Sequence, residues 1–475
     1  MTPQAAFEQL NRIAGLAPFG APVFTGEEAQ LSTPLRAATA AAASLGLAGA
    51  IAAELWRFRG GERQSVSLDL KAAAASLLSQ SFVRRNGAPP TVPAGPTTGF
   101  YQCADQRWIH LHGGSPRLAR RTLELLNAAN DAKSVLEGVA KWNGFALEEA
   151  LAYMQLCGAV ARSQEEWRAS MPGRALGAPI ALKKIGEAAP LRLVKAQTPL
   201  TGVRVLDLTR ALAGPACGQL LASHGAEVLA IRAERLDDGL DAQMSAGKRL
   251  SHLDLVKPAD AETLRRLARG AHIFLESFRP GAMDKLGFSP AALAYIAPGM
   301  IHVSISAYGA AGPWASRRGF EQSVETATGI ALEQGGFLAQ RRKQRRESLP
   351  ELLPGAVLDY VTGSLAAAGA LAALLRRIRE GGSWQVEVSL AATASWLMSL
   401  GRIEPRAVPD GFEAGTGLDQ YLRSCETEGG VLEFLGPVVR MSKTPPLLGA
   451  PPSRAEAPRW VSAREDVHAA QAQSA

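Results

Sequence analysis

The chain has 475 residues, of which 47% are hydrophobic and 20% charged, and its formal net charge is +7 at pH 7. This composition excludes a disordered chain, because it supplies enough apolar material for sizeable cores. At roughly 150 residues per domain, the length predicts about three domains. The four cysteines are far apart and form no CxxC pair, so a disulfide framework, a zinc site and a redox motif are not indicated. Sparse cysteines favour a reducing compartment, and we expect a cytoplasmic protein.

The mild positive charge has two interpretations: a solvated surface with a slight basic excess, or attraction of an anionic ligand. No nucleic-acid-binding motif is present, and we interpret the basic run 341–346 as a solvated loop rather than a phosphate contact or a localisation signal. Residues 1–15 lack the basic flank and apolar run of a signal peptide. The uncharged stretch Ala37–Ala53 is rich in Ala and Gly and short for a membrane span, so we expect a buried helix and no membrane partner.

Part of the chain occurs twice. Residues 44–59 and 364–379 are identical at ten of sixteen positions with a constant offset of 320. A Gly-Gly pair and a short strand ending in Val-Ser-Leu then follow in both copies. Two Ala-rich helices can be similar by chance, but this ordered continuation favours an ancestral duplication in which each copy is incomplete.

The first copy continues through a Gly/Pro-rich loop at 86–99. Asp105 and Gln106 are expected to form a hairpin turn between two short strands within 100–113. Helical patterns occupy about 115–170, and Pro and Gly near 172–200 indicate a boundary.

From 200 to 310, strand and helix patterns alternate. Strands are predicted at 203–208, 226–231, 271–275 and 300–305, and helices at 213–221 and 262–269. This alternation predicts a parallel sheet with crossover helices. The tail from about Pro451 lacks periodicity, and we expect it to be poorly ordered.

Several motifs in this region share their order and spacing with one known family. They read LTGVRVLDLTRALAGPACGQLLASHGAEVLAI (200–231), SAGKRLSHLDL (245–255), ESFRPGAMDKLG (276–287), SISAYGAAGP (304–313), GFEQSVETATG (319–329) and LDYVTGSLAAAGALAALL (358–375). Together they resemble the class III CoA-transferases, which include formyl-CoA transferase, carnitine CoA-transferase and α-methylacyl-CoA racemases. Residues 36–195 resemble the later part of the same family fold, and 429–446 resembles its C-terminal segment.

The resemblance implies an α/β protein with an open Rossmann-like parallel sheet domain, a smaller α+β domain, and commonly an interlocked homodimer. We divide the chain into a partial first copy with the small domain (1–199), a CoA-binding sheet domain with the catalytic residue (200–400), and a C-terminal segment and tail (401–475).

Asp359 is the candidate catalytic residue. From the residues alone, a carboxylate directly before a helix starting near Gly363 is a helix cap. The resemblance instead implies the family's catalytic aspartate, because Asp359 and Gly363 fit its Asp-x-x-x-Gly pattern. The first copy has Thr39 at the equivalent position and is expected to be inactive. The implied activity is acyl-CoA:carboxylate CoA transfer through mixed anhydrides and an aspartyl-CoA thioester. The 86–99 loop is interpreted either as a cover that excludes water or as a plain connection.

Coenzyme A is expected as substrate, with no permanently bound cofactor, and a carboxylic acid as the second substrate. By family position, the candidates around CoA are Arg210, Ala211, Phe278, Lys285 and Arg318. Lys248 and Arg249 lie in another matching motif, and a solvated basic pair is their alternative interpretation. No spacing of His, Cys, Asp or Glu predicts a metal site.

Three motifs depart from the family pattern. Ala230-Ile231-Arg232 replaces its Lys-x-Glu, Ser277 replaces its Asn, and Phe320 stands where racemases place a histidine. An α-methylacyl-CoA racemase or isomerase is the second hypothesis. Phe320 disfavours it, because a phenyl ring cannot move a proton. A non-catalytic CoA-binding scaffold is the third.

Overall fold

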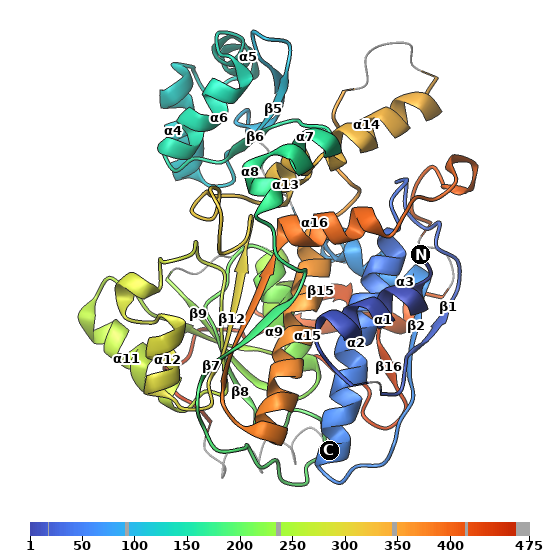
Figure 1. Ribbon diagram of the computed structural model, residues 1–475, viewed down its shortest axis with the longest axis vertical. Helices are drawn as coiled ribbons and strands as arrows, with labels where there is room; N and C mark the ends of the chain where they lie inside the picture. The colour runs from blue at the N-terminus through green and yellow to red at the C-terminus, as the bar shows by residue number, and fades with distance from the viewer. Residues whose placement is uncertain (18, 91–94, 234–238, 344–348, 414–416, 462–475) are drawn as a thin grey trace.

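A seven-stranded sheet is the centre of the fold (Figure 1). The computed structural model describes residues 1–17, 19–90, 95–233, 239–343, 349–413 and 417–461. The strand order is β10-β9-β8-β11-β12-β13-β7; the first six strands are parallel, and β7 pairs antiparallel with β13. In that order the strands are Arg249–His252, Glu227–Arg232, Arg204–Asp207, Ile273–Glu276, Ile301–Ser306, Ser383–Ser389 and Ala181–Gly186.

Numbered along the chain, the six parallel strands lie in the order 3-2-1-4-5-6, which is that of the doubly wound dinucleotide-binding fold. The predicted open Rossmann-like sheet is therefore confirmed.

Successive strand residues pack into two different cores. Val205 and Ile273 belong to the core shared with helices α9 (Ala213–Ser223) and α15 (Val357–Glu380). Their neighbours Leu206 and Phe274 belong to the core under α11 (Pro258–Arg269) and α12 (Pro290–Ile296). Because successive side chains of a strand point to opposite faces, both faces of the sheet are buried against helices.

The smaller α+β unit has its own core. Its antiparallel sheet is formed by β4 (Thr98–Gln102), β5 (Trp108–His112) and β6 (Gly158–Val160), and it packs with α4 (Pro116–Leu126), α5 (Ala132–Val139) and α6 (Gly144–Tyr153). The predicted hairpin turn is confirmed, since Gln106 adopts a φ of 63° between β4 and β5. This unit lies above the sheet in Figure 1.

The N-terminal helices pack on the sheet domain rather than apart from it. They are α1 (Pro3–Ile13), α2 (Ala37–Phe58) and α3 (Leu70–Leu77), and α2 lies against α15. Helices α2 and α15 are long and apolar enough to cross a membrane, but 89% and 94% of their most apolar windows are buried inside the protein. The interpretation of Ala37–Ala53 as a buried helix is therefore confirmed.

The two repeated segments fold with the same order of elements. The first forms α2, β2 (Val66–Asp69) and α3; the second forms α15, β13 and α16 (Leu390–Ser399). However, β2 pairs with β1 (Val23–Thr25) and β16 (Arg440–Met441) in a separate sheet. The duplication stays a prediction, as does the division at residue 199, across which one hydrophobic core extends.

The remaining described elements surround these units. They are β3 (Arg84–Arg85), β14 (Leu422–Thr427) and β15 (Gly430–Leu435) in a third small sheet, helices α7 (Gln164–Ala169), α8 (Met171–Arg174), α10 (Gly239–Ser245), α13 (Glu321–Thr328) and α14 (Ile330–Arg341), and the 3-10 turns η1 (Ser79–Phe82), η2 (Asp284–Leu286), η3 (Pro405–Ala407) and η4 (Asp419–Tyr421).

The C-terminal segment differs from its prediction. Residues 451–461 are packed onto the sheet domain: Glu456 pairs with Arg249 at 2.8 Å, and Trp460 Nε1 donates to the carbonyl of Leu267 at 3.0 Å. The expectation of a poorly ordered tail is wrong for this part, because an apolar ring and a charge partner hold it. Residues 462–475 lie outside the described residues.

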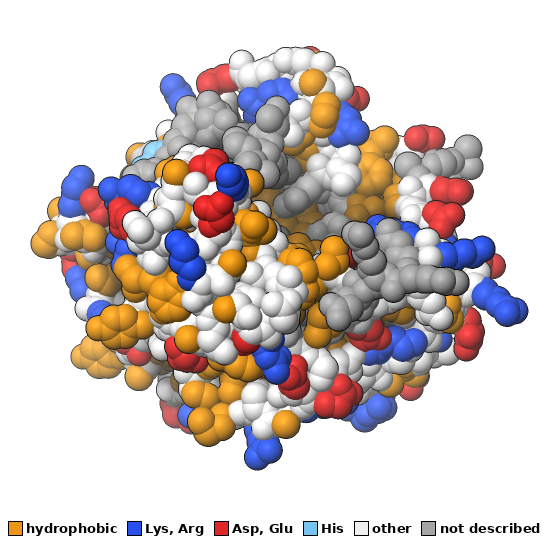
Figure 2. All heavy atoms as spheres, turned by 90° about the horizontal axis from the view of Figure 1, so that it is seen from above, with side chains coloured by type: hydrophobic (Ala, Val, Ile, Leu, Met, Phe, Trp, Pro, Cys, Tyr) orange, Lys and Arg blue, Asp and Glu red, His pale blue; other side chains and the backbone are white. Residues whose placement is uncertain are grey.

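Basic side chains are scattered among acidic and apolar ones on the face seen from above, rather than gathered in one patch (Figure 2). Two described members of the 341–346 run are paired: Arg341 with Asp410, and Arg342 with Glu351. Residues 344–346 of this run and 91–94 of the 86–99 loop lie outside the described residues.

Candidate active site

Three carboxyl groups meet where helices α13 and α15 begin. Asp359 lies in the first turn of α15, which starts at Val357 and not near Gly363 as predicted. Glu321 is the first residue of α13, and Glu325 follows one turn later. The Glu321 and Glu325 residues are only 2% and 1% exposed, whereas Asp359 keeps partial solvent access. Asp359 is therefore the least buried residue of the cluster.

Backbone N–H groups hold these carboxylates in place. Leu358 N donates to Glu321 Oε1 at 2.7 Å, and Leu353 N donates to Glu325 Oε2 at 2.9 Å. The backbone N–H of Ala213, the first residue of α9, bonds to Asp359 and favours its charged form. The partial positive charge of a helix N-terminus acts in the same direction.

The cluster retains a proton near neutral pH. Burial raises the pKa of Asp359 to about 6 and that of Glu325 to about 7. Burial, followed by the charges of Asp359 and Glu325, raises the pKa of Glu321 well above its usual value. Among the described residues no N–H or hydroxyl donor bonds Glu321 Oε2, so a proton on Glu321 lets it donate to a neighbouring carboxylate. The three groups titrate as one coupled unit.

Gly363 allows α9 to approach the cluster. A Cβ placed on Gly363 would lie 2.5 Å from the carbonyl oxygen of Ala213 and 3.1 Å from the Cβ of Ala216. Only glycine fits this crossing without a shift of one helix. The Asp-x-x-x-Gly spacing thus has a physical reason: Gly363 sits one turn after Asp359 and brings the start of α9 against it.

The turns after β8 and β11 meet beside this site. Arg210 N donates to Ser277 Oγ at 3.0 Å, so the serine that replaces the family's asparagine joins the two turns. Ala211 has a φ of 63°, a conformation that costs a non-glycine residue energy and occurs most often at functional sites. Between the carboxyl ends of these two strands lies the point where strand order reverses, the usual ligand crevice of such sheets. The structure therefore brings together the turns that carry Arg210, Ala211 and Phe278, and their contact with CoA stays a prediction.

Four arginines of the sheet domain and the smaller unit lie near enough for the other three to act on the charge of Arg318. Arg318 Nε donates to the carbonyl of Gln155 at 3.2 Å. After burial, the nearby charges of Arg279, Arg117 and Arg121 lower the pKa of Arg318. In the described part of the chain none of the four pairs with a carboxylate. Predicted Lys285 is exposed on η2. These cations are available to an anion.

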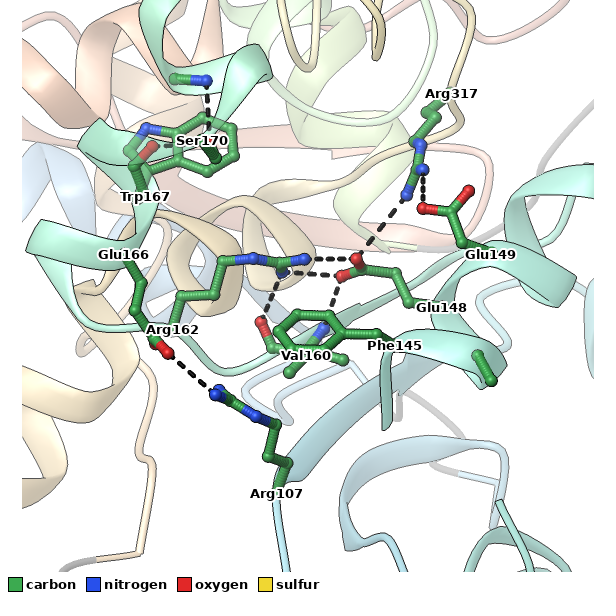
Figure 3. A network of polar contacts seen from close by, with 12 residues as sticks. Arg107, Phe145, Glu148, Glu149, Val160, Arg162, Glu166, Trp167, Ser170 and Arg317 are labelled. Carbon is green, nitrogen blue, oxygen red and sulfur yellow. Dashed lines mark hydrogen bonds and ion pairs between the residues drawn. The ribbon is translucent and has the colours of Figure 1, made fainter. Parts of the chain in front are cut away.

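A buried ion network holds the loop that carries Arg318 (Figure 3). Arg162 Nη1 donates to Glu148 Oε1 at 2.8 Å, and Arg317 Nη1 lies 3.8 Å from Glu148 Oε2. The Arg162 and Arg317 guanidinium carbons also lie 5.1 and 4.1 Å from the Trp314 ring centroid. The smaller unit is thereby fixed to residues 314–317, directly before Arg318.

Lys248 and Arg249 both pair with carboxylates of the protein. Lys248 Nζ lies 2.9 Å from Asp207 Oδ2, and both side chains are 0% exposed, so a solvated basic pair is wrong for Lys248. Arg249 pairs with Glu227 and Glu456 at 2.8 Å each. Both cations already have protein partners. Their contact with CoA stays a prediction without an unpaired charge to support it.

The first-copy position differs from Asp359 in chemistry. Thr39 is fully buried, and its backbone N donates to Glu28 Oε2 at 3.0 Å. Its hydroxyl bonds to the same carboxylate. Burial raises the pKa of Glu28 to about 7. Thr39 thus has a neighbouring carboxyl group in Glu28, but it has no carboxylate of its own to correspond to that of Asp359.

Two functional residues were not identified from the sequence. They are Glu321 and Glu325, both on α13. Their spacing of four residues in GFEQSVE places both on one helix face, which was the available signal.

A family model described as "CoA-transferase family III" matches residues 200–411. This segment of the chain is therefore similar to CoA-transferase family III. This segment carries every residue of the carboxylate cluster and all seven predicted CoA contacts.

Among curated proteins, an "Acyl-CoA transferase" of Gibberella moniliformis is 31% identical over 62% of this chain and 55% of its own length. The "Probable fatty acyl-CoA transferase Rv3272" of Mycobacterium tuberculosis is 32% identical over 42% of this chain and 52% of its own length. A "Formyl-CoA:oxalate CoA-transferase" of Escherichia coli is 30% identical over 41% and 48%. The chain spans about half the length of the curated relatives it matches.

Similar solved structures include Rv3272 of Mycobacterium tuberculosis, at 31% identity and a TM-score of 0.38 over 43% of this chain and 58% of that one. A CAIB/BAIF family protein of Brucella suis has 25% identity and a TM-score of 0.37 over 50% and 65%.

Proposed function

We propose that this family III chain transfers CoA between carboxylic acids, with Asp359 as the nucleophile. The observation that supports this is the position of Asp359: an accessible carboxylate beside two buried carboxyl groups and the N-terminus of α9. The donor acyl-CoA and the acceptor acid are the substrates, and the protein needs no resident cofactor. A cytoplasmic homodimer remains part of this proposal.

In the first half-reaction, an Asp359 carboxylate oxygen attacks the thioester carbonyl, and the C–S bond breaks. This gives a mixed anhydride and the CoA thiolate. The thiolate then attacks the aspartyl carbonyl and releases the donor acid, leaving an aspartyl-CoA thioester. The acceptor carboxylate attacks that thioester and expels the thiolate again; the thiolate then attacks the acceptor's carbonyl and regenerates Asp359.

The protein's own groups favour these steps at two points. Ionisation of Asp359 near pH 6 keeps it nucleophilic at neutral pH. The Ala213 N–H and a protonated Glu321 are donors beside the reacting carboxyl group, where negative charge develops on oxygen. Removing one such donor costs on the order of 10²–10³ in rate.

The unpaired arginines around Arg318 supply the charge that CoA phosphates require. Arg210 and Ala211 follow β8 at the crevice through which the thioester would reach Asp359. Binding of the anionic CoA would then account for part of the chain's net positive charge.

A trapping experiment tests this proposal. The full chain is incubated with a panel of acyl-CoA thioesters and then with hydroxylamine, which converts an aspartyl thioester or anhydride into a hydroxamate that peptide mass spectrometry locates. We expect the label on Asp359 and none in Asp359→Asn. The matched control Asp410→Asn, whose side chain is 98% exposed, should be labelled like the wild type. Tight CoA binding without any label would favour a non-catalytic scaffold.

One contact favours the isomerase alternative enough to test it. The ring of His112 lies 4.3 Å from that of Phe320, which directly precedes Glu321. An imidazole from the smaller unit therefore lies near the position where racemases carry theirs. Burial lowers the pKa of His112 to about 4, so the ring is neutral at pH 7. Deuterium from solvent entering the α-carbon of an acyl-CoA, without CoA exchange and dependent on His112, would favour isomerisation over transfer.

A further inference from the structure

A polar cleft lies at the carboxyl ends of β11, β12 and β13. On β12, His302, Ser304 and Ser306 line it, and on β13 their register partners are Gln385, Glu387 and Ser389. Central parallel strands normally present apolar side chains on both faces. This continuous polar face is therefore not explained by packing.

The cleft has the size of a small-molecule site. Its volume is about 390 Å³, within the range of ligand pockets. Ala175, Ala178 and Gly309 border it with small side chains, and Phe278 adds an aromatic ring. None of Asp359, Glu321 and Glu325 lines it, so the cleft is separate from the carboxylate cluster.

Two buried side chains that line the cleft, His302 and Glu276, have polar atoms without a hydrogen-bond partner among the described residues. His302 is 3% exposed, and in the described part of the chain neither of its ring nitrogens has a hydrogen-bond partner. Its Nε2 lies 3.7 Å from Glu276 Oε1, beyond hydrogen-bond distance. Glu276 is 6% exposed, and its other oxygen accepts from Phe278 N at 2.7 Å. An unsatisfied imidazole and a free carboxyl oxygen thus both face the cavity.

The charge of the lining selects the ligand. Three carboxyl groups line the cleft, from Glu276, Asp284 and Glu387, and none of the lining residues is Lys or Arg. This is the opposite of the chain as a whole, which carries a net charge of +7. An anion would meet three carboxyl groups and no cationic Lys or Arg side chain here. A cation would meet carboxyl groups, hydroxyl oxygens and the aromatic ring of Phe278.

We propose that this cleft binds a small organic cation, a molecule carrying a primary or quaternary ammonium group, at a site distinct from Asp359. The proposal goes beyond CoA transfer and does not depend on it.

Proton linkage gives the proposal a specific signature. Burial raises the pKa of Glu276 to about 8, and Asp284 contributes in the same direction. Most molecules therefore hold a proton on Glu276 at pH 7. An ammonium ion in the cleft favours the charged carboxylate and expels that proton. Burial lowers the pKa of His302 to about 4, so the imidazole stays neutral, and Glu387 on β13 is the third carboxyl residue of the lining.

The test is titration of the full chain with choline chloride and with ethylammonium chloride, followed by calorimetry and, in unbuffered salt solution, by a pH-stat. We expect saturable binding at one site, release of nearly one proton at pH 7, and affinity that rises between pH 6 and pH 8.5. Sodium acetate and glycerol, as the anionic and neutral probes, should not bind.

Variants separate the site from folding effects. Glu276→Gln should weaken choline binding roughly tenfold and abolish proton release. Asp284→Asn, on the exposed rim, should weaken binding without abolishing proton release. Glu8→Gln on α1, exposed and far from the cleft in the fold, should change neither. Lack of saturable binding, equal binding of acetate, or an unaltered Glu276→Gln titration would overturn the proposal. Displacement of choline by CoA would also overturn it, because the cleft would then belong to the CoA site.

Discussion

Gly363→Ala perturbs the active site without touching a polar group. The new methyl would lie 2.5 Å from the Ala213 carbonyl oxygen, while Cβ atoms do not approach other atoms closer than 3.0 Å. Helix α9 or α15 must therefore move by about 0.5 Å or more. Since Ala213 N–H bonds to Asp359, that movement separates a donor from the proposed nucleophile. Misplacement of this order costs about 10–100-fold in rate.

Stability should change much less than activity. Alanine is favoured over glycine inside a helix by about 1 kcal/mol, whereas overpacking a core costs about 1–3 kcal/mol. The net loss is therefore about 0–2 kcal/mol. Gly369→Ala is the matched control, because Gly369 lies in the same helix but away from the carboxylate cluster. Its new Cβ would lie equally close to a neighbour, 2.5 Å from Val386 Cγ1 on β13.

The assay compares hydroxamate labelling rates at Asp359 and urea unfolding for the two variants. We expect slow labelling only in Gly363→Ala and similar small stability losses in both. Wild-type labelling in Gly363→Ala, or an equal labelling defect in Gly369→Ala, would refute the role assigned to the α9–α15 crossing.

Three further predictions follow from charge and burial. The value of kcat/KM for CoA transfer should rise with pH through about 6, because Asp359 must lose its proton; a flat profile would contradict this. Glu148→Ala leaves the Arg162 guanidinium buried without its main partner and should lower the free energy of unfolding by about 3–5 kcal/mol, against less than about 1 kcal/mol for exposed Glu149→Ala. Lys248→Met leaves a buried carboxylate unpaired, so its melting temperature should fall further below wild type at pH 8 than at pH 5; an equal deficit at both would contradict this.

The sheet was predictable because its signals are local. Four of the parallel strands are short apolar runs, and the crossover helices carry their own periodicity, so these elements could be predicted along the chain. The short strand β10 and the order of the strands in the sheet could not, because they depend on contacts between distant segments. The position of Asp359 within α15 could not be predicted in the same way, because no residue between Val357 and Gly363 caps or breaks the helix to mark where it begins. The structure starts the helix six residues earlier, and the proposed nucleophile becomes part of its first turn.

The carboxylate cluster shows where local reasoning ends. Glu321 and Asp359 are 38 residues apart, and only the packing of α13 against the start of α15 brings their side chains together. At Lys248 the sequence misled in another way, because the basic pair Lys248-Arg249 was expected either to face solvent or to face CoA. The sequence shows the charge there, but not the burial of Asp207 beneath it.

The packing of α2 against α15 decides which piece of this protein can be produced alone. The family match begins at residue 200, and a fragment starting there would omit α2 and the edge strand β7. The apolar side of α15 that α2 covers would then face water, and β13 would present an unpaired edge. The boundary drawn by family resemblance therefore cuts through one hydrophobic core, and the residues before 200 must accompany the sheet to keep that core covered.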